Sequence, residues 1–399
     1  MTDATRANVA LLAFCQALSM TGLNILVTTS SLVGYSLLED KAFATLPMTL
    51  QVTGTMLSTI PASLLMARIG RRAGFTVGAL IGFAGALLAA VAIFRSSFPL
   101  FCCGTAMLGS YAGFAIFYRF AAADTASEAF RPRAVSLVMA GGIAAAIFGP
   151  EIAKWSRNLF EPVLFAGCYL MIAALCLTAV ALLQFVRIPR PPRVAFGAGR
   201  PLGEIVRSRG FVVAALCGMI GYGVMNLVMT ATPLAMVGCG LAFEQAAFVI
   251  QWHVLGMFAP SFFTGSLIGR FGAARMMACG ALLLFACVGV NLSGTDAPRF
   301  WTGLVLLGLG WNFLFVGAST LLTTVYTPIE RAKVQALNDF LVFGMVSGTS
   351  FSSGVLLAHS GWTAVNLAVL PLIGVALVAA LAFGPRRAAA AVAASARPT

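Results

Sequence analysis

Long apolar runs make up most of this chain, so an ionisable side chain inside one of them indicates chemistry. His253 is the histidine that falls within such a run, and histidine titrates near neutral pH. It is therefore the simplest candidate for a proton-coupling group, together with Gln51, which occupies the matching place 202 residues earlier. A lone buried histidine also serves as a structural hydrogen-bond donor, so both interpretations stay open.

Arg119 is the charged residue most informative about a solute. It lies late in the fourth apolar run, beside the face of a predicted helix that carries Tyr111 and Tyr118. An arginine in that position suits an anionic or carbonyl-bearing solute. The alternative is that Arg119 reaches the membrane surface, or pairs with Asp339 or Glu128.

Amide and hydroxyl side chains recur near the middle of two other apolar runs. Asn24 and Thr28 in the first run match Asn226 and Thr230 in the seventh, and Tyr222 lies one turn before Asn226. Paired polar residues at this depth are where a transporter would contact its solute. Asparagine also cross-links membrane helices through hydrogen bonds, and this explanation has equal weight.

Trp311 and Asn312 bring an aromatic ring and an amide to a similar depth in the tenth run. Further aromatic residues are expected nearby, namely Tyr111, Phe117, Tyr118 and Phe315. Together with the polar pairs, they predict a cavity for a flat, partly apolar solute with hydrogen-bonding edges.

The elements that position these residues must be membrane-spanning helices. Hydrophobic residues make up 60% of the chain, charged residues 9%, and the mean hydropathy is +0.96, which a soluble protein of 399 residues could not accommodate. A spanning helix needs roughly 20 apolar residues. The sequence predicts twelve, at 10–35, 45–67, 74–94, 98–123, 134–152, 163–186, 211–236, 246–268, 276–294, 300–324, 335–358 and 363–384.

The two halves of the chain repeat each other at an offset of 202 residues. QVTGTMLSTIPASLLMARIG at 51–70 matches HVLGMFAPSFFTGSLIGRFG at 253–272 in its valine, glycine, leucine and arginine positions. Duplicated membrane halves favour a secondary transporter with its site between the repeats. We expect a six-helix bundle over 1–186, a cytoplasmic linker over 187–210, and a second bundle with a short tail over 211–399.

The positive charge orients the helices in the membrane. With the N-terminus inside, 20 arginines and lysines fall in cytoplasmic segments and 5 in external ones. This positive-inside distribution predicts cytoplasmic termini in a multi-pass protein of the inner (plasma) membrane. The net charge of +13 therefore indicates contact with anionic lipid headgroups, and a nucleic-acid partner is not expected.

One loop resembles a known family signature. SLLMARIGRR at 63–72 is similar to the cytoplasmic loop of the major facilitator superfamily, G-x-L-x-D-R-x-G-R-R, and matches it at Leu65, Arg68, Gly70, Arg71 and Arg72. Ala67 replaces the aspartate. The second-half copy at 265–272 keeps the arginine and the last glycine as Arg270 and Gly272. The resemblance implies twelve helices in two pseudo-symmetric bundles and transport by alternating access.

The same resemblance implies that this loop gates the cytoplasmic side. In the family, its arginine pairs with an acid at the end of the fourth span, a role that Asp124 can fill. Because Ala67 replaces the family's aspartate, the resemblance does not say which residue takes the role of that aspartate. We hypothesise that Asp339, about one turn inside the eleventh span, supplies an acid from the opposite wall and pairs with Arg68 or Arg71. The alternative is that Asp339 is an acid favoured by a helix N-terminus.

The fifth span contains a partial match to a second family pattern. AGGIAAAIFGP at 140–150 ends in Gly149-Pro150, which resembles the span-five motif of drug/proton antiporters. The other glycines of that motif are replaced. A helix kink near a gate explains the pair equally well.

The sequence does not suggest an enzyme, because it lacks the common catalytic and phosphate-binding motifs. Its cysteines and histidines show no metal-ligand spacing, so neither a metal nor another cofactor is expected. We predict a monomeric secondary transporter of a small organic solute, driven by a proton gradient. The alternatives are a multidrug/proton antiporter and a transport-inactive relative that acts as a sensor.

Overall fold

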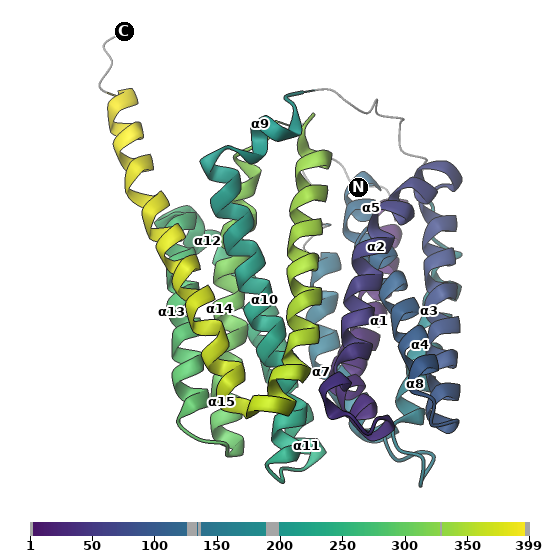
Figure 1. Ribbon diagram of the computed structural model, residues 1–399. Helices are drawn as coiled ribbons and strands as arrows, with labels where there is room; N and C mark the ends of the chain where they lie inside the picture. Colours follow the sequence, from purple (N-terminus) through teal and green to yellow (C-terminus); the bar gives the residue numbers. More distant parts are fainter. Residues whose placement is uncertain (1–2, 126–133, 135–136, 189–198, 328, 396–399) are drawn as a thin grey trace. The chain divides into compact units, whose positions relative to one another are not determined.

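The computed structural model describes residues 3–125, 134, 137–188, 199–327 and 329–395, and all regular secondary structure in this part is helical (Figure 1). The first half contains α1 (Asp3–Leu37), η1 (Lys41–Phe43), α2 (Leu46–Ile69), α3 (Arg71–Phe94), α4 (Phe98–Ala115), α5 (Tyr118–Thr125), α7 (Gly141–Ser156) and α8 (Ala166–Leu183). The second half contains α9 (Leu202–Val206), α10 (Arg209–Gly238), α11 (Phe243–Phe258), α12 (Ser261–Phe271), α13 (Ala273–Leu292), α14 (Ala297–Thr323) and α15 (Arg331–Ser395).

The described helices account for the predicted number of spans. Ten stretches are long and apolar enough to cross a membrane, and the bent pair α11–α12 adds an eleventh. The tenth stretch, Lys333–Phe383, contains two spans, because α15 changes direction at Gly361, whose backbone is not helical. In Figure 1 its two segments run in opposite directions. Ten, plus one for the bent pair and one for the divided α15, gives the twelve predicted spans.

Two of these spans are interrupted within the apolar region. The fourth span, Phe98–Ala122, consists of α4 and α5 with a short turn at 116–117 between them. The eighth consists of α11 and α12, whose axes differ by 41°. We predicted neither interruption, because each segment is long and mostly apolar, and a helix-bending proline, Pro260, marks only the second of them.

The signature loop and its copy form matching sharp junctions between helices. Gly70 alone separates α2 from α3, and Gly272 alone separates α12 from α13. Their φ angles are +93° and +85°, which a side chain would make unfavourable. Each N–H closes the preceding helix, Gly70 on the Met66 carbonyl and Gly272 on the Ile268 carbonyl. The two glycines of the motif are therefore required by the turn itself.

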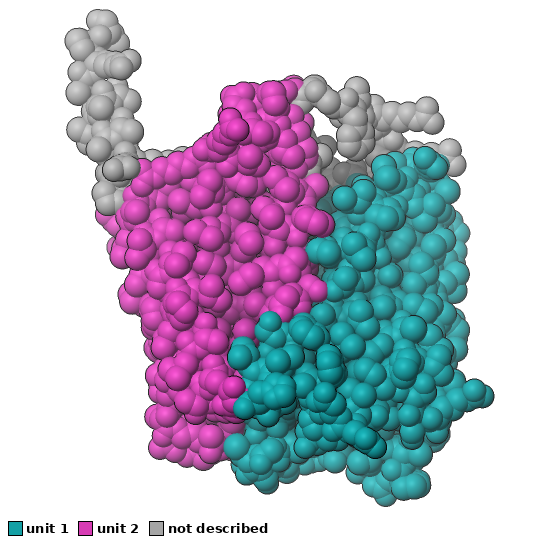
Figure 2. Space-filling view, viewed as in Figure 1, with its two compact units in different colours: residues 1–194, 230–251, 350–359 teal, residues 195–229, 252–349, 360–399 magenta. Residues whose placement is uncertain are grey.

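The chain forms two compact units, coloured separately in Figure 2. Unit 1 contains residues 1–194, 230–251 and 350–359, and unit 2 contains residues 195–229, 252–349 and 360–399. Each unit thus has a core from one sequence half, and unit 1 also includes two short segments of the second half.

One of these segments is held in unit 1 by a cluster at the start of α11. The Arg157 guanidinium lies 4.8 Å from the ring centroid of Phe243 and 5.4 Å from that of Phe165. It also forms an ion pair with Glu244 at 3.4 Å. Aromatic and charged contacts of the same arginine therefore join the α7–α8 connection to the beginning of α11.

In unit 2, an ion pair ties the segment before α9 to the segment before α15. Arg200 donates from Nε and Nη2 to the two carboxylate oxygens of Glu330, at 2.9 and 2.8 Å. The backbone N–H groups of Arg200 and Thr327 donate to the same carboxylate. These donors hold the pKa of Glu330 well below its usual range, because all of them stabilise the ionised form.

Candidate functional site

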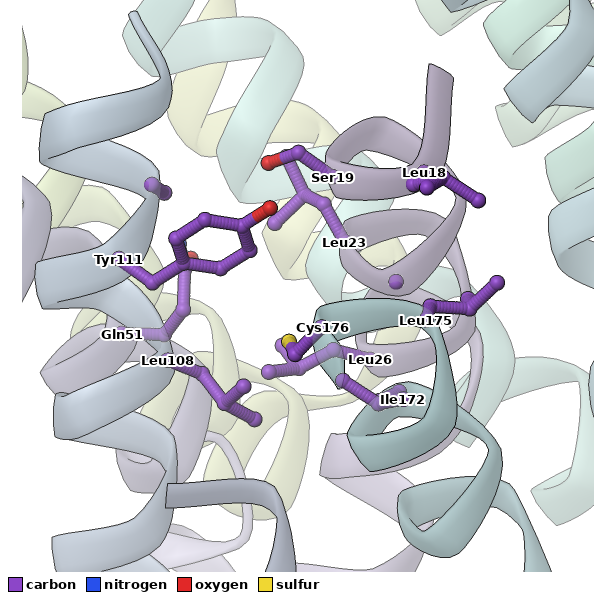
Figure 3. Close-up of a pocket in the computed structure, with 12 residues that line it drawn as sticks. Leu18, Ser19, Leu23, Leu26, Gln51, Leu108, Tyr111, Ile172, Leu175 and Cys176 are labelled. Atoms are coloured by element: carbon purple, nitrogen blue, oxygen red, sulfur yellow. The ribbon is translucent and has the colours of Figure 1, made fainter. Parts of the chain in front are cut away.

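Unit 1 contains a cavity between α1, α2, α4 and α8 (Figure 3). Its cavity volume is about 20 Å³, which is room for a water molecule or one small polar group and not for a whole organic solute. Apolar side chains form most of the wall, and Ser19, Gln51 and Tyr111 add polar groups. The residues lining it are Leu18, Ser19, Gly22, Leu23, Leu26, Gln51, Leu108, Tyr111, Ala112, Ile172, Leu175 and Cys176.

Two predicted site residues, Gln51 and Tyr111, meet at this cavity. The Tyr111 hydroxyl is buried, and its polar side-chain neighbours are the hydroxyls of Ser19 and Tyr118. In Figure 3 it points toward the side of the cavity where Ser19 lies. The Gln51 amide donates to the Thr55 hydroxyl at 3.2 Å. No hydrogen bond within 3.5 Å uses the Tyr111 hydroxyl in the described chain, so a polar group of a bound molecule could form one.

Four other predicted residues of unit 1 do not line this cavity. Asn24 lies against α7, where a side chain on Gly149 would come within 2.5 Å of its Cβ. Thr28 bonds back to the Asn24 carbonyl at 2.7 Å. Tyr118 is fully buried with its ring edge-on to Phe75, at 4.7 Å between centroids. Arg119, the fourth of these residues, lies beside the Phe120 ring instead.

Arg119 is the second residue of α5, directly after the turn that interrupts the fourth span. Its guanidinium lies 4.8 Å from the ring centroid of Phe120 and the side chain is partly exposed. Of the partners proposed for it, Glu128 lies outside the described residues. Contact with a solute therefore stays a prediction.

Unit 2 contains a cluster of aromatic rings around Trp311. The Trp311 ring stacks on Phe315 with centroids 5.1 Å apart and planes at 10°. The Tyr222 ring stands edge-on to both, at 5.3 Å from each. Phe258 and Phe343 extend the cluster at 6.3 Å from Trp311 and 6.1 Å from Tyr222. We call these five residues the aromatic cluster; stacked and edge-on rings of this kind bind planar molecules well.

The predicted polar pair of the second half has two different environments. The Asn226 amide donates to the Val346 carbonyl at 3.1 Å and so links α10 to α15. The Thr230 hydroxyl, one turn later, is buried with no hydrogen-bond partner in the described chain. Asn226 thus makes the helix cross-link that was the alternative to solute contact, and Thr230 remains available to a ligand.

Asn312 is fully buried and its amide is fully used by protein partners. Nδ2 donates to the Met257 carbonyl at 2.7 Å and to the Ser261 hydroxyl at 2.8 Å. Oδ1 accepts from the Thr264 hydroxyl at 2.6 Å. The geometry therefore assigns this amide to holding α11 and α12 against α14.

His253 is fully buried in α11, and its Nδ1 lies 2.9 Å from the Leu304 carbonyl of α14. A carbonyl oxygen accepts, so Nδ1 carries the hydrogen. Nε2 is buried without a partner in the described chain. The first nitrogen makes the structural bond expected of a lone histidine, and the second is the atom at which a proton would be taken up.

Of the predicted gate residues, Arg68, Gly70, Arg71 and Arg72 lie at the first glycine junction and Arg270 and Gly272 at the second. Arg68 and Arg270 are exposed near the C-terminal ends of α2 and α12, and Arg72 donates to Gln184 of α8 at 3.2 Å. Arg71 and Asp339 each make interactions within the described structure. The side chain of Asp124 lies outside the described part, so the pairings predicted for these residues stay predictions.

Sequence reasoning missed several residues of these sites. Ser19 and Cys176 of the cavity were not predicted, and neither were Phe258 and Phe343 of the aromatic cluster. Ser19 shares a helix face with Leu23 and Leu26, but only the structure shows that this face borders a cavity. Phe258 and Phe343 carry no comparable signal in a chain with 31 phenylalanines.

A family model for the Major Facilitator Superfamily matches residues 10–342 of the chain. The protein belongs to this superfamily. It is therefore a multi-pass membrane transporter that handles a small-molecule solute, and not an enzyme. The resemblance of the loop at 63–72 led to the same family, and the match confirms it.

Two similar sequences cover almost the whole chain. The riboflavin transporter RfnT of Brucella anthropi is 45% identical over 383 residues, which cover 95% of this chain and 96% of the relative. An uncharacterised transporter of this superfamily from Bacillus subtilis, YddS, is 28% identical, covering 92% of this chain and 89% of the relative.

Solved structures agree on the fold. A bacterial homologue of the human lysosomal transporter Spinster, solved inward-facing and unoccupied, has a TM-score of 0.70 at 15% identity and covers 96% of each chain. The superfamily member FucP, solved in an outward conformation, has a TM-score of 0.63 at 17% identity, covering 95% of this chain and 99% of its own. At these identities the likeness concerns the fold alone.

Proposed function

We propose that this member of the superfamily transports riboflavin, or a closely related flavin, by alternating access driven by a proton gradient. The observation that carries the proposal is the 45% identity to a riboflavin transporter over nearly the full length of both chains. It agrees with the flat, partly apolar solute with polar edges that the sequence favours.

The chemistry of riboflavin suits the groups found in the two units. Its three fused rings form a flat surface that stacks on aromatic side chains, as the rings of the aromatic cluster already stack on one another. One edge of the ring system carries carbonyl and N–H groups, which match hydroxyl and amide side chains such as those of Tyr111 and Gln51.

Binding of riboflavin to the purified protein tests the substrate directly. We expect the fluorescence of bound riboflavin to be quenched on the aromatic cluster and the melting temperature of the protein to rise with riboflavin concentration. Replacing Trp311 by leucine should weaken binding by roughly tenfold, the value of one good stacking contact. Trp301→Leu is the control, since Trp301 lies in the same helix and packs on Trp252 at 5.7 Å. Failure of the wild-type protein to bind riboflavin would reject the proposal.

The proton coupling is proposed on His253. Wild-type protein in liposomes should accumulate riboflavin when a pH gradient is imposed, and exchange riboflavin across the membrane when there is none. His253→Gln should keep the exchange and lose the accumulation, because glutamine cannot carry a proton at that depth. Accumulation that persists in His253→Gln removes this residue from the coupling mechanism.

We place both termini in the cytoplasm on the basis of the positive-inside distribution. The Asn8 side chain exchanges hydrogen bonds with the backbone of Arg187, at 2.7 and 2.9 Å, so the start of α1 and the segment after α8 lie on the same side of the membrane. A cysteine introduced at position 187, with the exposed native cysteines replaced by serine, should react with a membrane-impermeant maleimide in opened cells and not in intact ones.

A further inference from the structure

Side-chain hydrogen bonds stabilise the interruption of the eighth span. Pro260 has no N–H, so it cannot donate to the carbonyl of Gly256 four residues earlier. Phe262 bonds to the Ala259 carbonyl at 3.4 Å, a shorter-range pattern than the helical one, and α12 resumes as Phe263 and Thr264 bond to Pro260. Backbone groups freed in this way must find partners when the surrounding medium is hydrocarbon.

Asn312 of α14 bonds to groups on both sides of the break, one of them the backbone carbonyl of Met257. It donates to the Met257 carbonyl before the break and to the Ser261 hydroxyl after it. Its oxygen accepts from Thr264, one turn into α12. A single amide therefore contacts both sides of the break, and the bonds it makes fit the bent arrangement, with axes 41° apart.

A proline alone does not explain this break. In the first half, α2 runs without interruption from Leu46 to Ile69 although Pro61 lies within it. At the place that corresponds to the bond between Asn312 and Met257, the first half has Gly113 close to the Thr55 carbonyl, where an added Cβ would lie at 3.0 Å. The first half has Ser58 in place of Pro260 and Gly113 in place of Asn312, so the break accompanies the proline and the amide together.

The break is also in contact with the aromatic cluster. Phe258 is the last residue of α11, and its ring lies 6.3 Å from that of Trp311. Trp311 directly precedes Asn312 in α14. A molecule that moves the Trp311 ring must therefore disturb the residues on which the bent geometry of α11 and α12 depends.

We propose that the break at Ala259–Pro260 is a hinge of the transport cycle and that Asn312 is its positioning residue. This rests on the proposed riboflavin transport. Solute bound at the aromatic cluster shifts Phe258 and Trp311, and α12 then changes its angle to α11 while Asn312 keeps the freed carbonyl and hydroxyl groups satisfied. The hinge is needed for turnover and not for binding.

Pro260→Ala is the decisive variant, because alanine restores the missing N–H and allows a continuous helix. We expect riboflavin affinity within about threefold of wild type, an unchanged or higher melting temperature, and a fall in riboflavin exchange of at least tenfold. Hydrogen exchange of the amides at 257–264 should slow. Pro61→Ala is the matched control and should leave exchange of riboflavin within about twofold of wild type.

If Pro260 affected stability alone, the more stable Pro260→Ala protein should transport riboflavin as well as wild type or better. Wild-type turnover in Pro260→Ala would therefore overturn the proposal. Absence of riboflavin binding by the wild type would reject the proposed function instead, and slower hydrogen exchange in Pro260→Ala would still show whether the break is a mobile element.

Thr264→Val provides a second measurement if Pro260→Ala fails to fold. It removes a hydroxyl whose one hydrogen lies between Asn312 Oδ1 at 2.6 Å and the Pro260 carbonyl at 2.8 Å, with little change in shape. We expect faster hydrogen exchange at 257–264 and a changed ratio of turnover to riboflavin affinity. Thr320→Val is the control, since Thr320 bonds to the Val316 carbonyl of its own helix at 2.8 Å. Equal effects of the two valine variants would argue against the hinge.

Discussion

The pair α2 and α4 in unit 1 and the pair α11–α12 and α14 in unit 2 are repeats of one another, and they differ in which helix is interrupted: the fourth span in unit 1 and the eighth span in the second repeat. In both pairs a glycine brings two helix backbones together. An added Cβ on Gly109 would lie 1.9 Å from the Gln51 carbonyl oxygen, and one on Gly308 would lie 2.5 Å from the His253 carbonyl oxygen. Gln51 and His253 are 202 residues apart and the glycines 199, so the two contacts correspond closely.

One turn beyond this shared contact, the repeats diverge. Unit 1 has Gly113 and a continuous α2, whereas unit 2 has Asn312 and a broken helix held by its amide. Next to the shared contact, unit 1 has a small cavity lined by the Tyr111 side chain, and unit 2 has the aromatic cluster. The comparison shows that the duplicated bundles keep this backbone contact while the side chains around it differ, among them Pro260 for Ser58 and Asn312 for Gly113.

The largest expected effect comes from breaking the shared glycine contact. Gly109→Ala should lower the free energy of unfolding by about 3 kcal/mol, because its Cβ would overlap a backbone carbonyl that cannot move aside. Gly308→Ala should cost less, since its nearest atom is further away. Thermal unfolding of the purified protein measures both. Gly344→Ala is the control, because nothing lies within 4 Å of its added Cβ.

Asn312→Ala should come next, with a loss of about 2 kcal/mol in the free energy of unfolding. It leaves the Thr264 hydroxyl without this bond and the Met257 carbonyl without its Asn312 donor. The comparison variant in unit 1 is Gln51→Ala, which removes the single side-chain bond to Thr55 and should cost about 1 kcal/mol. Equal losses in the two variants would contradict the view that the second repeat depends on its amide.

Tyr111→Phe should change riboflavin binding more than stability. The hydroxyl has the Ser19 and Tyr118 hydroxyls as neighbours but no hydrogen bond within 3.5 Å in the described chain, so its removal should lower the free energy of unfolding by at most about 1 kcal/mol. If this hydroxyl contacts a polar group of the flavin, riboflavin affinity should fall by roughly fivefold, the value of one hydrogen bond. Unchanged affinity would show that the cavity takes no part in binding, and titration of riboflavin fluorescence measures it.

The smallest effect should be a pH dependence that arises in unit 2. The folded pKa of Glu330 is below its ordinary value of 4.5, so its contribution to stability is complete above that value and is lost as the pH falls through the folded pKa. The melting temperature of the wild type should therefore fall more steeply below about pH 4.5 than that of Glu330→Gln. Parallel pH profiles of the two proteins would show that the ion pair with Arg200 adds no stability.

The fold was predictable because hydrocarbon imposes a length and a composition on every spanning helix. The twelve spans, the repeat and the loop glycines at 70 and 272 are all visible in residue types and spacing. Of the residues predicted for the site, Gln51 and Tyr111 line the cavity and Tyr222 and Trp311 belong to the aromatic cluster, and their contact with a solute or a proton stays a prediction. The sequence does not show which asparagine side chains are available to contact the solute and which hydrogen-bond to neighbouring helices.

The sequence by itself determined that this chain crosses a membrane many times, that it does so as a repeated pair of bundles, and that it belongs among transporters. These properties depend on how many apolar residues follow one another and on where charge accumulates. The tertiary structure alone decided that Asn312 holds a broken helix, that Tyr111 faces a cavity, and that five rings meet around Trp311 and Tyr222. The reason is that a polar or aromatic side chain has the same identity whether a neighbouring helix satisfies it or leaves it free for a ligand.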